Sequence, residues 1–349
     1  MAIRREIDPE ELALAASGDK PTLKTISRLS GLAVPTVSRA LNDAPDIGFD
    51  TKQFIRSIAD AIGYVPNRAG VRLRTGRTNV ISLVLSTDHD MMNHTARLIS
   101  SLASELRNTP YHLIVTPFFP DEDILKPIRY IVETKSADAL IMNQVRPNDP
   151  RVKYLMEHNF PFATHGRSQW CAEHPYVDFD NTAYGDLSIQ KLVQNGRKSI
   201  AMLAPPLEHN YAREMVLGGT NRAREAGIDF FVIQEITSDE PMVRMQNYLV
   251  DLFRKRPDID GIVCGSTNGT LAAAAAVEAD GRTVGKEIDL VGKESVPVLK
   301  LFRDKIIVLP ENVDSVGQRL AHAAIRAIRE PDEKPLQHLD VPTLADFGE

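Results

Sequence analysis

Short apolar runs alternate with amphipathic stretches from residue 79 onward, and this alternation constrains the fold more than any other feature of the chain. The expected strands span 80–86, 112–118, 139–143, 162–166, 176–179, 199–204, 230–235, 261–264, 289–291 and 306–309. The expected helices between them include 95–106, 182–193, 211–226, 241–253, 270–279 and 313–328. Strands that alternate with helices form parallel sheets joined by crossover helices. The sequence therefore predicts an α/β body, residues 80–349, built as two doubly wound parallel-sheet lobes.

Polar residues follow several of the expected strands. Ligands of doubly wound sheets bind beyond the carboxyl ends of the strands, and two facing lobes place that site in the cleft between them. Each of these residues alone is more often a solvated loop group or a helix cap, but together they predict a cleft lining suited to the hydroxyl groups of a sugar. The candidates are Asp88, His89, His165, Arg167, Asp178, Asn210, Arg213, Thr267, Asn268, Glu294 and Glu311.

No catalytic or cofactor motif stands out in the body. It has no GxGxxG after the first expected strand, and no GxxxxGK[ST], GxSxG or HExxH string. His209 and Arg213 could suggest acid–base chemistry, but no nucleophile or paired carboxylate is placed beside them. Gly218-Gly219 lies inside a helical stretch, where close packing is the better explanation. We expect binding rather than catalysis, and no cofactor. A sugar-modifying enzyme and a solute-binding protein for transport remain the alternatives.

A basic segment precedes the body. Residues 20–79 hold ten Lys and Arg and four Asp and Glu, a formal charge of +6, whereas residues 1–19 carry −3 and residues 80–349 carry −9. A basic module on an acidic body indicates a polyanion partner for that module alone, although a solvated basic face would have the same charge.

Three short helices are expected in the basic segment, at 22–29, 34–41 and 51–62. Thr22 can cap the first helix, and Gly31 can supply the positive φ of a tight turn before the second. Pro35 is tolerated in the first turn of the second helix. The pattern is that of a helix-turn-helix with one supporting helix, in which the second helix enters the major groove of DNA.

The strings in this segment resemble those of a known family. Thr22-Leu23, Ser30-Gly31-Leu32-Ala33 and Thr36-Val37-Ser38-Arg39-Ala40-Leu41-Asn42 resemble the N-terminus of the lactose/galactose-repressor (LacI/GalR) family of bacterial transcription regulators. The body strings 161–167 and 177–181 look like family segments that line the effector pocket, and they mark Arg167 and Asp178 as ligand contacts. The resemblance implies lobes like those of periplasmic sugar-binding proteins.

The resemblance also implies a function. It implies a sequence-specific DNA-binding regulator, most simply a repressor, controlled by a small polar effector in the cleft. A sugar or sugar derivative is expected, and a purine or another polar metabolite stays open. Two copies must match a near-palindromic double-stranded operator, so a cytoplasmic homodimer is expected.

The family pattern divides the chain and marks its DNA contacts. The expected parts are an N-terminal extension (1–20), a helix-turn-helix domain (21–66), a hinge helix and linker (67–79) and the body (80–349). Leu73 would be the wedge that partly unstacks a base step in the minor groove. The expected DNA contacts are Thr22, Leu23, Val34, Pro35, Thr36, Ser38, Arg39, Asn42, Asn67, Arg68, Leu73 and Arg74.

Several positions depart from the family pattern. Ala33 and Gly48 replace the usual serine caps of two helices, and Val34 and Pro35 occupy the two main base-reading positions. Apolar side chains can contact thymine methyl groups but make no bidentate hydrogen bonds, so base discrimination should depend on Arg39 and on DNA shape. An operator preference unchanged by Val34→Gln and Pro35→Ala would contradict this. In the pocket, the departures are Met215, Thr267, Glu311 and the single acidic residue of Lys293-Glu294-Ser295.

The remaining features are ordinary. The two cysteines, Cys171 and Cys264, have no CxxC partner, and buried free thiols are expected rather than a disulfide. No Cys/His spacing is typical of a metal site. The N-terminus lacks the apolar stretch of a secretory signal, and no apolar run is long enough for a membrane-spanning helix.

Overall fold

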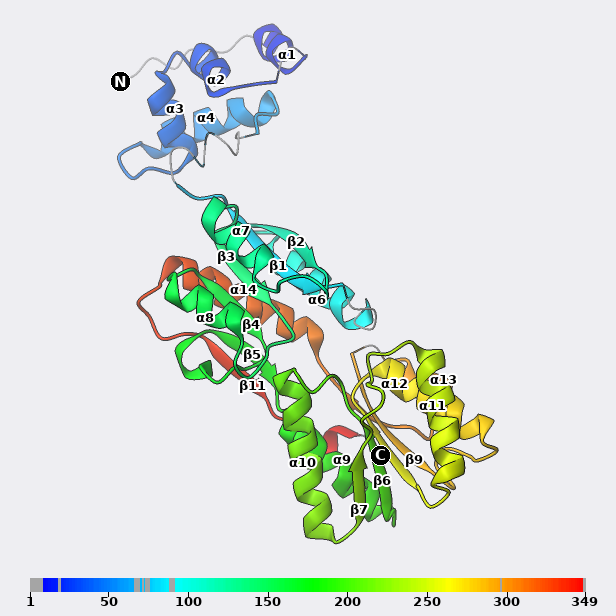
Figure 1. Cartoon of the computed structure of the whole chain (residues 1–349). Coiled ribbons are helices and arrows are strands. Elements are labelled where there is room, and N and C mark those ends of the chain that lie inside the picture. The colour runs from blue at the N-terminus through cyan, green and yellow to red at the C-terminus, as the bar shows by residue number, and fades with distance from the viewer. Residues whose placement is uncertain are drawn as a thin grey trace. The chain divides into compact units, whose positions relative to one another are not determined.

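The structure is a computed structural model that describes residues 9–17, 20–65, 70, 72, 76–87, 92–295 and 297–347. It divides into two compact units, Met1–Thr78, here the head, and Asn79–Glu349, the body. Figure 1 labels the elements of each unit along the chain.

The head contains a helix-turn-helix, as predicted. Its helices are α1 (Pro9–Ser17), α2 (Leu23–Ser30), α3 (Val34–Leu41) and α4 (Phe49–Ala61). Thr22 caps α2 in a capping box, because its Oγ1 accepts from Thr25 N at 3.4 Å while Thr25 Oγ1 accepts from Thr22 N at 3.1 Å. Gly31 has a φ of 71°, the left-handed conformation that the turn requires. Helix α4 begins two residues before the predicted start at residue 51.

Helix α1, from the N-terminal extension, packs into the core of the head. Ala15 is buried, and Leu12 packs partly buried against the same cluster. Ile26, Val37 and Ile55 bring α2, α3 and α4 into that cluster. The extension therefore contributes apolar surface to the head.

The first lobe of the body is a six-stranded parallel sheet in the order β11-β5-β4-β3-β1-β2. Two separate core clusters cover its faces, one formed with α6 and α14 and the other with α7 and α8. Alternate β1 residues enter opposite clusters, Ile81 and Leu83 the first and Val80 and Val84 the second. The elements are β1 (Val80–Ser86), α6 (Met92–Leu106), β2 (His112–Phe118), α7 (Lys126–Thr134), β3 (Ala139–Met142), α8 (Pro150–Glu157), β4 (Phe162–His165), a 3-10 turn (Cys171–Glu173), β5 (Tyr176–Phe179), α14 (Val313–Arg329) and β11 (Gln337–Asp340).

The second lobe is a five-stranded parallel sheet in the order β10-β9-β8-β6-β7. Helices α11 and α12 share a cluster with one face, and α9 and α10 share a cluster with the other. The elements are α9 (Asn181–Gln194), β6 (Ser199–Leu203), α10 (Asn210–Ala226), β7 (Asp229–Val232), α11 (Met242–Lys255), β8 (Gly261–Cys264), α12 (Thr267–Ala279), β9 (Asp289–Glu294), α13 (Leu299–Phe302), β10 (Ile307–Pro310) and a 3-10 turn (Leu344–Phe347). Two doubly wound parallel lobes were predicted, and the structure confirms them.

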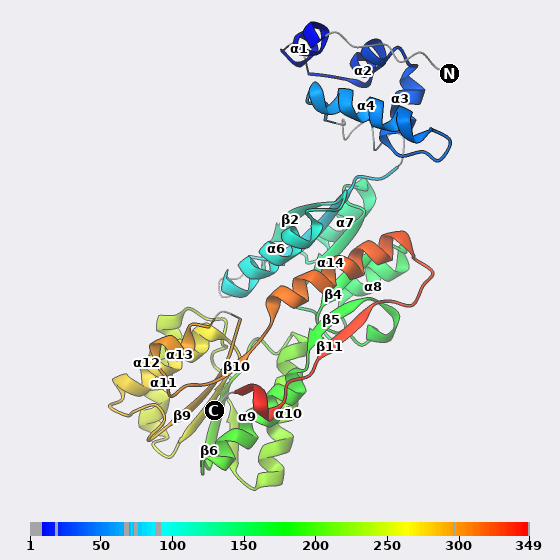
Figure 2. The same ribbon diagram turned by 180° about the vertical axis from the view of Figure 1, so that it is seen from behind.

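The chain passes between the lobes three times, after β5, after β10 and after β11 (Figure 2). At each crossing the chain leaves the carboxyl end of a strand, the edge at which ligands of doubly wound sheets bind. Strand β11, Gln337–Asp340, was not predicted, because its four residues contain one apolar side chain and give no strand pattern.

Two glycines allow α9 and α10 to pack unusually closely. A Cβ at Gly218 would lie 2.0 Å from Thr182 O, and a Cβ at Gly185 would lie 2.0 Å from Met215 O. The packing explanation for Gly218-Gly219 is thus confirmed.

Cys171 and Cys264 are free thiols; Cys264 is buried, as predicted, while Cys171 is only partly buried. Among the helices described here, none is both long and apolar enough to cross a membrane.

Candidate functional site: the interlobe cavity and the recognition helix

A cavity opens between the two lobes at the carboxyl ends of their strands. Its volume is about 140 Å³, roughly ten times the minimum that one water molecule needs. Polar side chains and two aromatic rings from both lobes surround it. The lining residues are His94, Asn143, Gln144, His165, Gly166, Asp178, Phe179, Asn181, Pro205, Tyr211, Asp239, Gly265, Ser266, Thr267, Asn268, Lys293, Glu294, Ser295 and Glu311.

The structure brings part of the predicted site together. The predicted residues that line the cavity are His165, Asp178, Thr267, Asn268, Glu294 and Glu311. Arg167, Asn210 and Arg213 are outside the lining, and Asp88 and His89 lie outside the described residues. Arg213 is exposed, and its Nε donates to Leu207 O at 2.7 Å.

Arg167 joins the two lobes. Its Nε donates to Asp178 Oδ2 at 2.8 Å within the first lobe, and its Nη2 donates to Glu214 Oε2 at 2.9 Å on α10 of the second lobe. Asn210 supports the same contact, since its Nδ2 donates to Glu214 Oε1 at 3.0 Å and its backbone N donates to Val145 O at 2.8 Å across the lobes. Arg167 and Asn210 therefore hold the lobe boundary in this arrangement.

This ionic cluster changes the titration of its carboxyl groups. Burial and the nearby Asp178 charge together raise the pKa of Glu214 to about 7, against the opposing effects of Arg167 and Asn210. Burial likewise raises the pKa of Asp178, although hydrogen bonds from Arg167 oppose it. Both carboxyl groups that share the Arg167 guanidinium therefore have a raised pKa.

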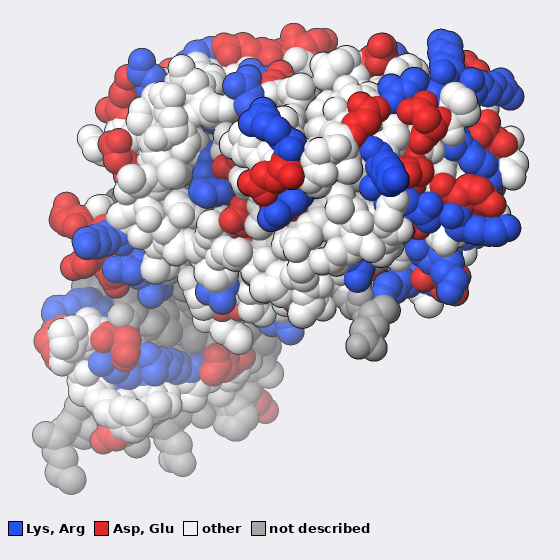
Figure 3. Space-filling model, turned by 90° about the horizontal axis from the view of Figure 1, so that it is seen from below, with Lys and Arg blue, Asp and Glu red and all other residues white. Residues whose placement is uncertain are grey.

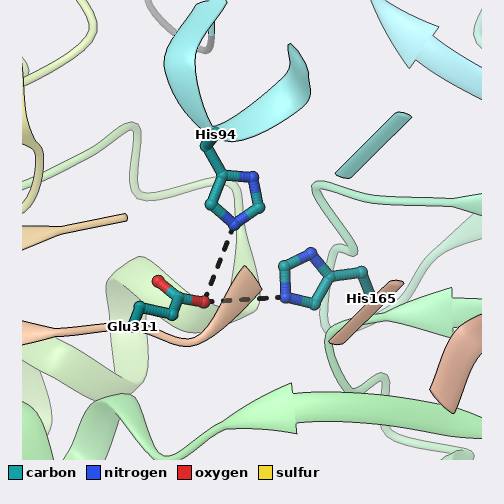
Figure 4. Close-up of side chains that lie close together, drawn as sticks. All are labelled: His94, His165 and Glu311. Carbon is teal, nitrogen blue, oxygen red and sulfur yellow. Dashed lines mark ion pairs between the residues drawn. The ribbon is translucent and has the colours of Figure 1, made fainter. Parts of the chain in front are cut away.

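A second cluster lies beside the crossing between β10 and α14. Glu311 Oε2 accepts from Lys293 Nζ at 2.9 Å, while Glu311 Oε1 lies 3.7 Å from His94 Nε2 and 3.8 Å from His165 Nε2 (Figure 4). The two imidazoles are stacked with their centroids 5.1 Å apart. Burial and the neighbouring His94 lower the pKa of His165 to about 3. Burial acts to raise the pKa of Glu311, but Lys293 and the histidines hold it well below its usual range.

The start of α12 and the end of β9 form another wall of the cavity. Ser266 caps α12, since its Oγ accepts from Gly269 N at 3.0 Å. Thr267 Oγ1 donates to Lys293 O at 3.1 Å. Glu294 Oε2 accepts from the backbone N of Val298 and of Leu299 at 3.0 and 2.9 Å, so this carboxylate caps α13 as well as lining the cavity.

Several lining residues were not among the predicted candidates. They come from five different segments and include His94, Asn143, Gln144, Phe179, Tyr211 and Asp239. The ring of Phe179 faces Lys293 Nζ, 4.2 Å from its centroid, and Tyr211 stacks on His209 with centroids 5.6 Å apart. Aromatic and amide residues give no pattern in sequence, so only their position after strand ends could have indicated them.

The recognition helix α3 presents the predicted side chains on its outer face. Val37 and Ala40 are buried, whereas Pro35 and Arg39 are exposed and Val34, Thr36 and Ser38 are partly exposed. Ala33 makes no side-chain cap, as expected. Arg39 pairs with Asp46 in the following loop, and Asn42 Nδ2 donates to Ser38 O at 2.6 Å.

The remaining predicted DNA contacts lie at the start of α2 and in the hinge. Leu23 is partly buried and packs against the head core, while Thr22 caps α2. The hinge contacts Asn67, Arg68, Leu73 and Arg74 lie outside the described residues, so the minor-groove wedge stays a prediction.

The surface of the body does not share the basic character of the head. On the face shown in Figure 3, basic and acidic side chains lie interspersed among uncharged residues. Charged side chains of the body also pair with one another, as Arg256 does with Asp229 and Asp258. Such a surface offers no extended field of one sign to a polyanion.

Comparisons with known proteins match both units. Residues 78–338 match the family described as periplasmic binding proteins and sugar binding domain of LacI family, and residues 22–67 match bacterial regulatory proteins, lacI family. The chain is 31% identical over 330 residues to the HTH-type transcriptional regulator AglR of Rhizobium meliloti. The aligned region covers 91% of this chain and 90% of AglR.

Solved structures show the same fold. The lac repressor dimer bound to operator and the anti-inducer ONPF has a TM-score of 0.78 at 17% identity, covering 93% of this chain and 97% of that one. The transcriptional regulator CelR–cellobiose complex has a TM-score of 0.68 at 21% identity, covering 92% and 97%.

Proposed function

The chain belongs to the lacI family of bacterial regulatory proteins and is a DNA-binding transcriptional regulator, and we propose that it is controlled by a sugar bound in the interlobe cavity. The observation that carries the proposal is the cavity itself. It lies where both lobes supply residues, so a ligand there contacts both and biases their relative position.

The chemistry of the lining supports a sugar over an apolar ligand. Sugar hydroxyls donate and accept hydrogen bonds, and the cavity offers amides, hydroxyls and carboxylates for both roles. The rings of Phe179 and Tyr211 supply apolar faces of the kind that orient a ligand in a polar pocket. The CelR neighbour was solved with cellobiose, which makes a disaccharide a natural first candidate.

The positions of the side chains around the cavity indicate which of them contact the ligand. We assign direct contacts to lining residues that project from both lobes: Asp178 and His165 from the first, and Thr267, Asn268 and Asp239 from the second. Arg167 acts differently, because its donors already bind Asp178 and Glu214. It links ligand-contacting Asp178 to α10, so it is placed to transmit a change in the cavity to the second lobe.

The remaining parts of the proposal concern the DNA complex. The regulator acts as a repressor in the cytoplasm, as a homodimer whose two heads read a near-palindromic operator. The lac repressor neighbour was solved as a dimer bound to operator. The outer face of α3 enters the major groove, with Val34, Pro35 and Arg39 toward the bases. We assign binding rather than catalysis to the cavity, since its buried charges are paired, Glu311 with Lys293 and Asp178 with Arg167.

A ligand screen on the full-length protein tests the effector. Thermal unfolding is followed with monosaccharides, disaccharides, sugar phosphates and purine nucleosides. A ligand at 100 times its Kd stabilises the native state by about 2.7 kcal/mol, so a specific sugar should raise the melting midpoint by several degrees. The same sugar should change the affinity for an operator selected in vitro, and NMR should recover it chemically unchanged.

Paired variants locate the binding site. Asn268→Ala, in the lining, should weaken the response to the sugar at least tenfold, as expected for a lost hydrogen bond to a buried group. Arg213→Ala is the matched control, because this exposed residue is outside the lining and should leave the response unchanged. Stabilisation by purines and by no sugar would refute the proposed ligand class. An equal loss in both variants would refute the proposed site.

A further inference from the structure

Three potential metal ligands converge on one point of the cavity wall. His94 comes from α6, His165 from the end of β4 and Glu311 from the crossing between β10 and α14. One ring nitrogen of each histidine and a carboxylate oxygen of Glu311 all lie within 4.8 Å of one another. Figure 4 shows both imidazoles directing Nε2 toward the same carboxylate oxygen.

The distances do not fit a direct hydrogen-bonded network. Glu311 Oε1 is 3.7 Å from His94 Nε2 and 3.8 Å from His165 Nε2, beyond the roughly 2.7–3.2 Å of a normal hydrogen bond. A zinc ion with ligand bonds of about 2.0–2.1 Å would set neighbouring ligand atoms about 3.4 Å apart. The two distances to Glu311 Oε1 exceed this value by only a few tenths of an ångström, and all three atoms lie within 4.8 Å of one another, so small side-chain movements would bring them to three corners of a tetrahedron.

His94 is a partly buried histidine whose ring has no hydrogen bond of normal length within the described part of the chain. Its Nδ1 is buried and has no hydrogen-bond partner among the residues that the structure describes. Its Nε2 is 3.7 Å from the nearest Glu311 oxygen. The ring therefore directs Nε2 at a carboxylate oxygen that lies beyond hydrogen-bond distance, a placement that a group bound between the two atoms would explain.

We propose that His94, His165 and Glu311 bind one divalent transition-metal ion of the zinc type, with the fourth coordination position open to the cavity. Two imidazoles and one carboxylate with an open position are a ligand set that zinc uses where it binds exchangeable oxygen ligands. All three residues line the cavity, so the open position faces the space that the effector would occupy.

Lys293 is compatible with this ion. Its Nζ lies 2.9 Å from Glu311 Oε2, the carboxylate oxygen that does not face the histidines. A hydrogen bond to the second oxygen orients a ligating carboxylate, as outer-shell partners of metal sites commonly do. The lining also holds four carboxylates, Asp178, Asp239, Glu294 and Glu311, against the ammonium of Lys293 and the adjacent guanidinium of Arg167, so the formal charge at the cavity is −2 and favours a cation.

The ion would link the crossing between β10 and α14 to the first lobe. His94 and His165 belong to that lobe, whereas Glu311 lies on the chain that leads back from the second. The ion would also offer a Lewis-acidic position to a hydroxyl or carboxylate oxygen of the effector. This second consequence rests on the proposed sugar function, while binding of the ion does not.

Metal binding to the full-length protein tests the inference. Protein stripped with a chelator is titrated with Zn²⁺ by calorimetry and with Co²⁺ by absorption spectroscopy. We expect one ion per chain and the visible spectrum of tetrahedral Co²⁺. X-ray absorption of the zinc form should show two imidazole ligands.

Ligand variants should weaken the binding and a surface variant should not. Glu311→Gln and His165→Asn should each lower zinc affinity at least tenfold, since even outer-shell changes cost about 10–100-fold. His322→Asn is the matched control, because His322 Nε2 forms an exposed pair with Glu105 at 2.7 Å. Unchanged melting midpoints in chelator would show that the variants fold.

Two results would overturn the metal site. One is the absence of stoichiometric binding of Zn²⁺ or Co²⁺ by the chelator-treated protein. The other is binding that Glu311→Gln and His165→Asn leave unchanged. Sugar-induced stabilisation measured in chelator reports on the proposed effector separately, so failure of one idea is distinguishable from failure of the other.

Discussion

Glu214 makes the boundary between the lobes dependent on pH in the neutral range. Its carboxylate accepts from Arg167 Nη2 at 2.9 Å and from Asn210 Nδ2 at 3.0 Å, and only about a fifth of the side chain is exposed (19%). Burial and the neighbouring Asp178 raise its pKa from 4.5 to about 7. Glu214→Gln keeps the size and removes this ionisation.

The stability difference between the wild-type protein and Glu214→Gln changes with pH because the pKa of Glu214 differs between the folded and unfolded chains. Below pH 4.5, the ordinary pKa, the carboxyl group is protonated in both folded and unfolded chains and resembles the amide. As the pH rises, the unfolded chain ionises first, so the wild-type protein loses stability relative to Glu214→Gln until the pH passes about 7. At about 1.4 kcal/mol per pH unit, the interval from 4.5 to about 7 corresponds to about 3 kcal/mol.

Thermal unfolding of both proteins between about pH 5 and pH 8 measures this difference. One kcal/mol shifts the melting midpoint of a domain this large by about 2–4 °C, so the gap should widen toward high pH by roughly 6–10 °C. Any effect of the substitution that does not depend on ionisation, such as a change in packing, shifts both ends equally and cancels from this comparison, while the attraction to Arg167 is already included in the pKa of about 7.

A gap between the two midpoints that stays constant, or narrows, as the pH rises would refute the reasoning. It would mean that Glu214 ionises at its ordinary pKa in the folded protein, with Arg167 outweighing burial. Glu225→Gln is the matched control on the same helix, because this side chain is 66% exposed and its pair with Arg222 is a surface contact of little energetic weight.

Two further predictions concern packing and capping. Gly218→Ala should destabilise the body by at least about 3 kcal/mol in thermal or urea unfolding, because its Cβ would lie 2.0 Å from Thr182 O, whereas Leu217→Ala at an exposed neighbour should have little effect. A mild effect of Gly218→Ala would show that the two helices separate easily. Ala33→Ser supplies the missing cap of α3 and should stabilise the head by about 1 kcal/mol and tighten operator binding, measured by fluorescence anisotropy. Gly48→Ser should stabilise α4 without tightening operator binding, and an equal gain in both variants would contradict a phosphate contact at position 33.

Local patterns were sufficient to predict most of the architecture. Apolar runs such as Val80–Ser86 and Gly261–Cys264 are buried on both faces of parallel sheets, so their composition alone identifies them as strands. The capping box at Thr22 and the left-handed Gly31 depend on neighbouring residues and were equally predictable. Strand β11 was missed because it forms by pairing with β5, 158 residues or more earlier in the chain, rather than by its own propensity.

The site was only partly predictable for the same reason. Position after a strand end identified His165, Asp178 and Glu311 as candidates, since parallel strands end at one edge of a sheet. The same rule included Arg167, which the structure instead turns toward Glu214. A side chain at a strand end can face the ligand or the other lobe, and nothing in its own segment decides between them.

By itself, the sequence determined that this chain carries a helix-turn-helix and two α/β lobes, because helices, strands and turns are set by the periodicity of neighbouring residues. The tertiary structure alone decided which polar groups meet. His94, His165 and Glu311 are separated by 71 and 146 residues and converge only because α6, β4 and the crossing after β10 end at one place. Convergence of this kind depends on how whole sheets and crossings pack, and no local spacing encodes it.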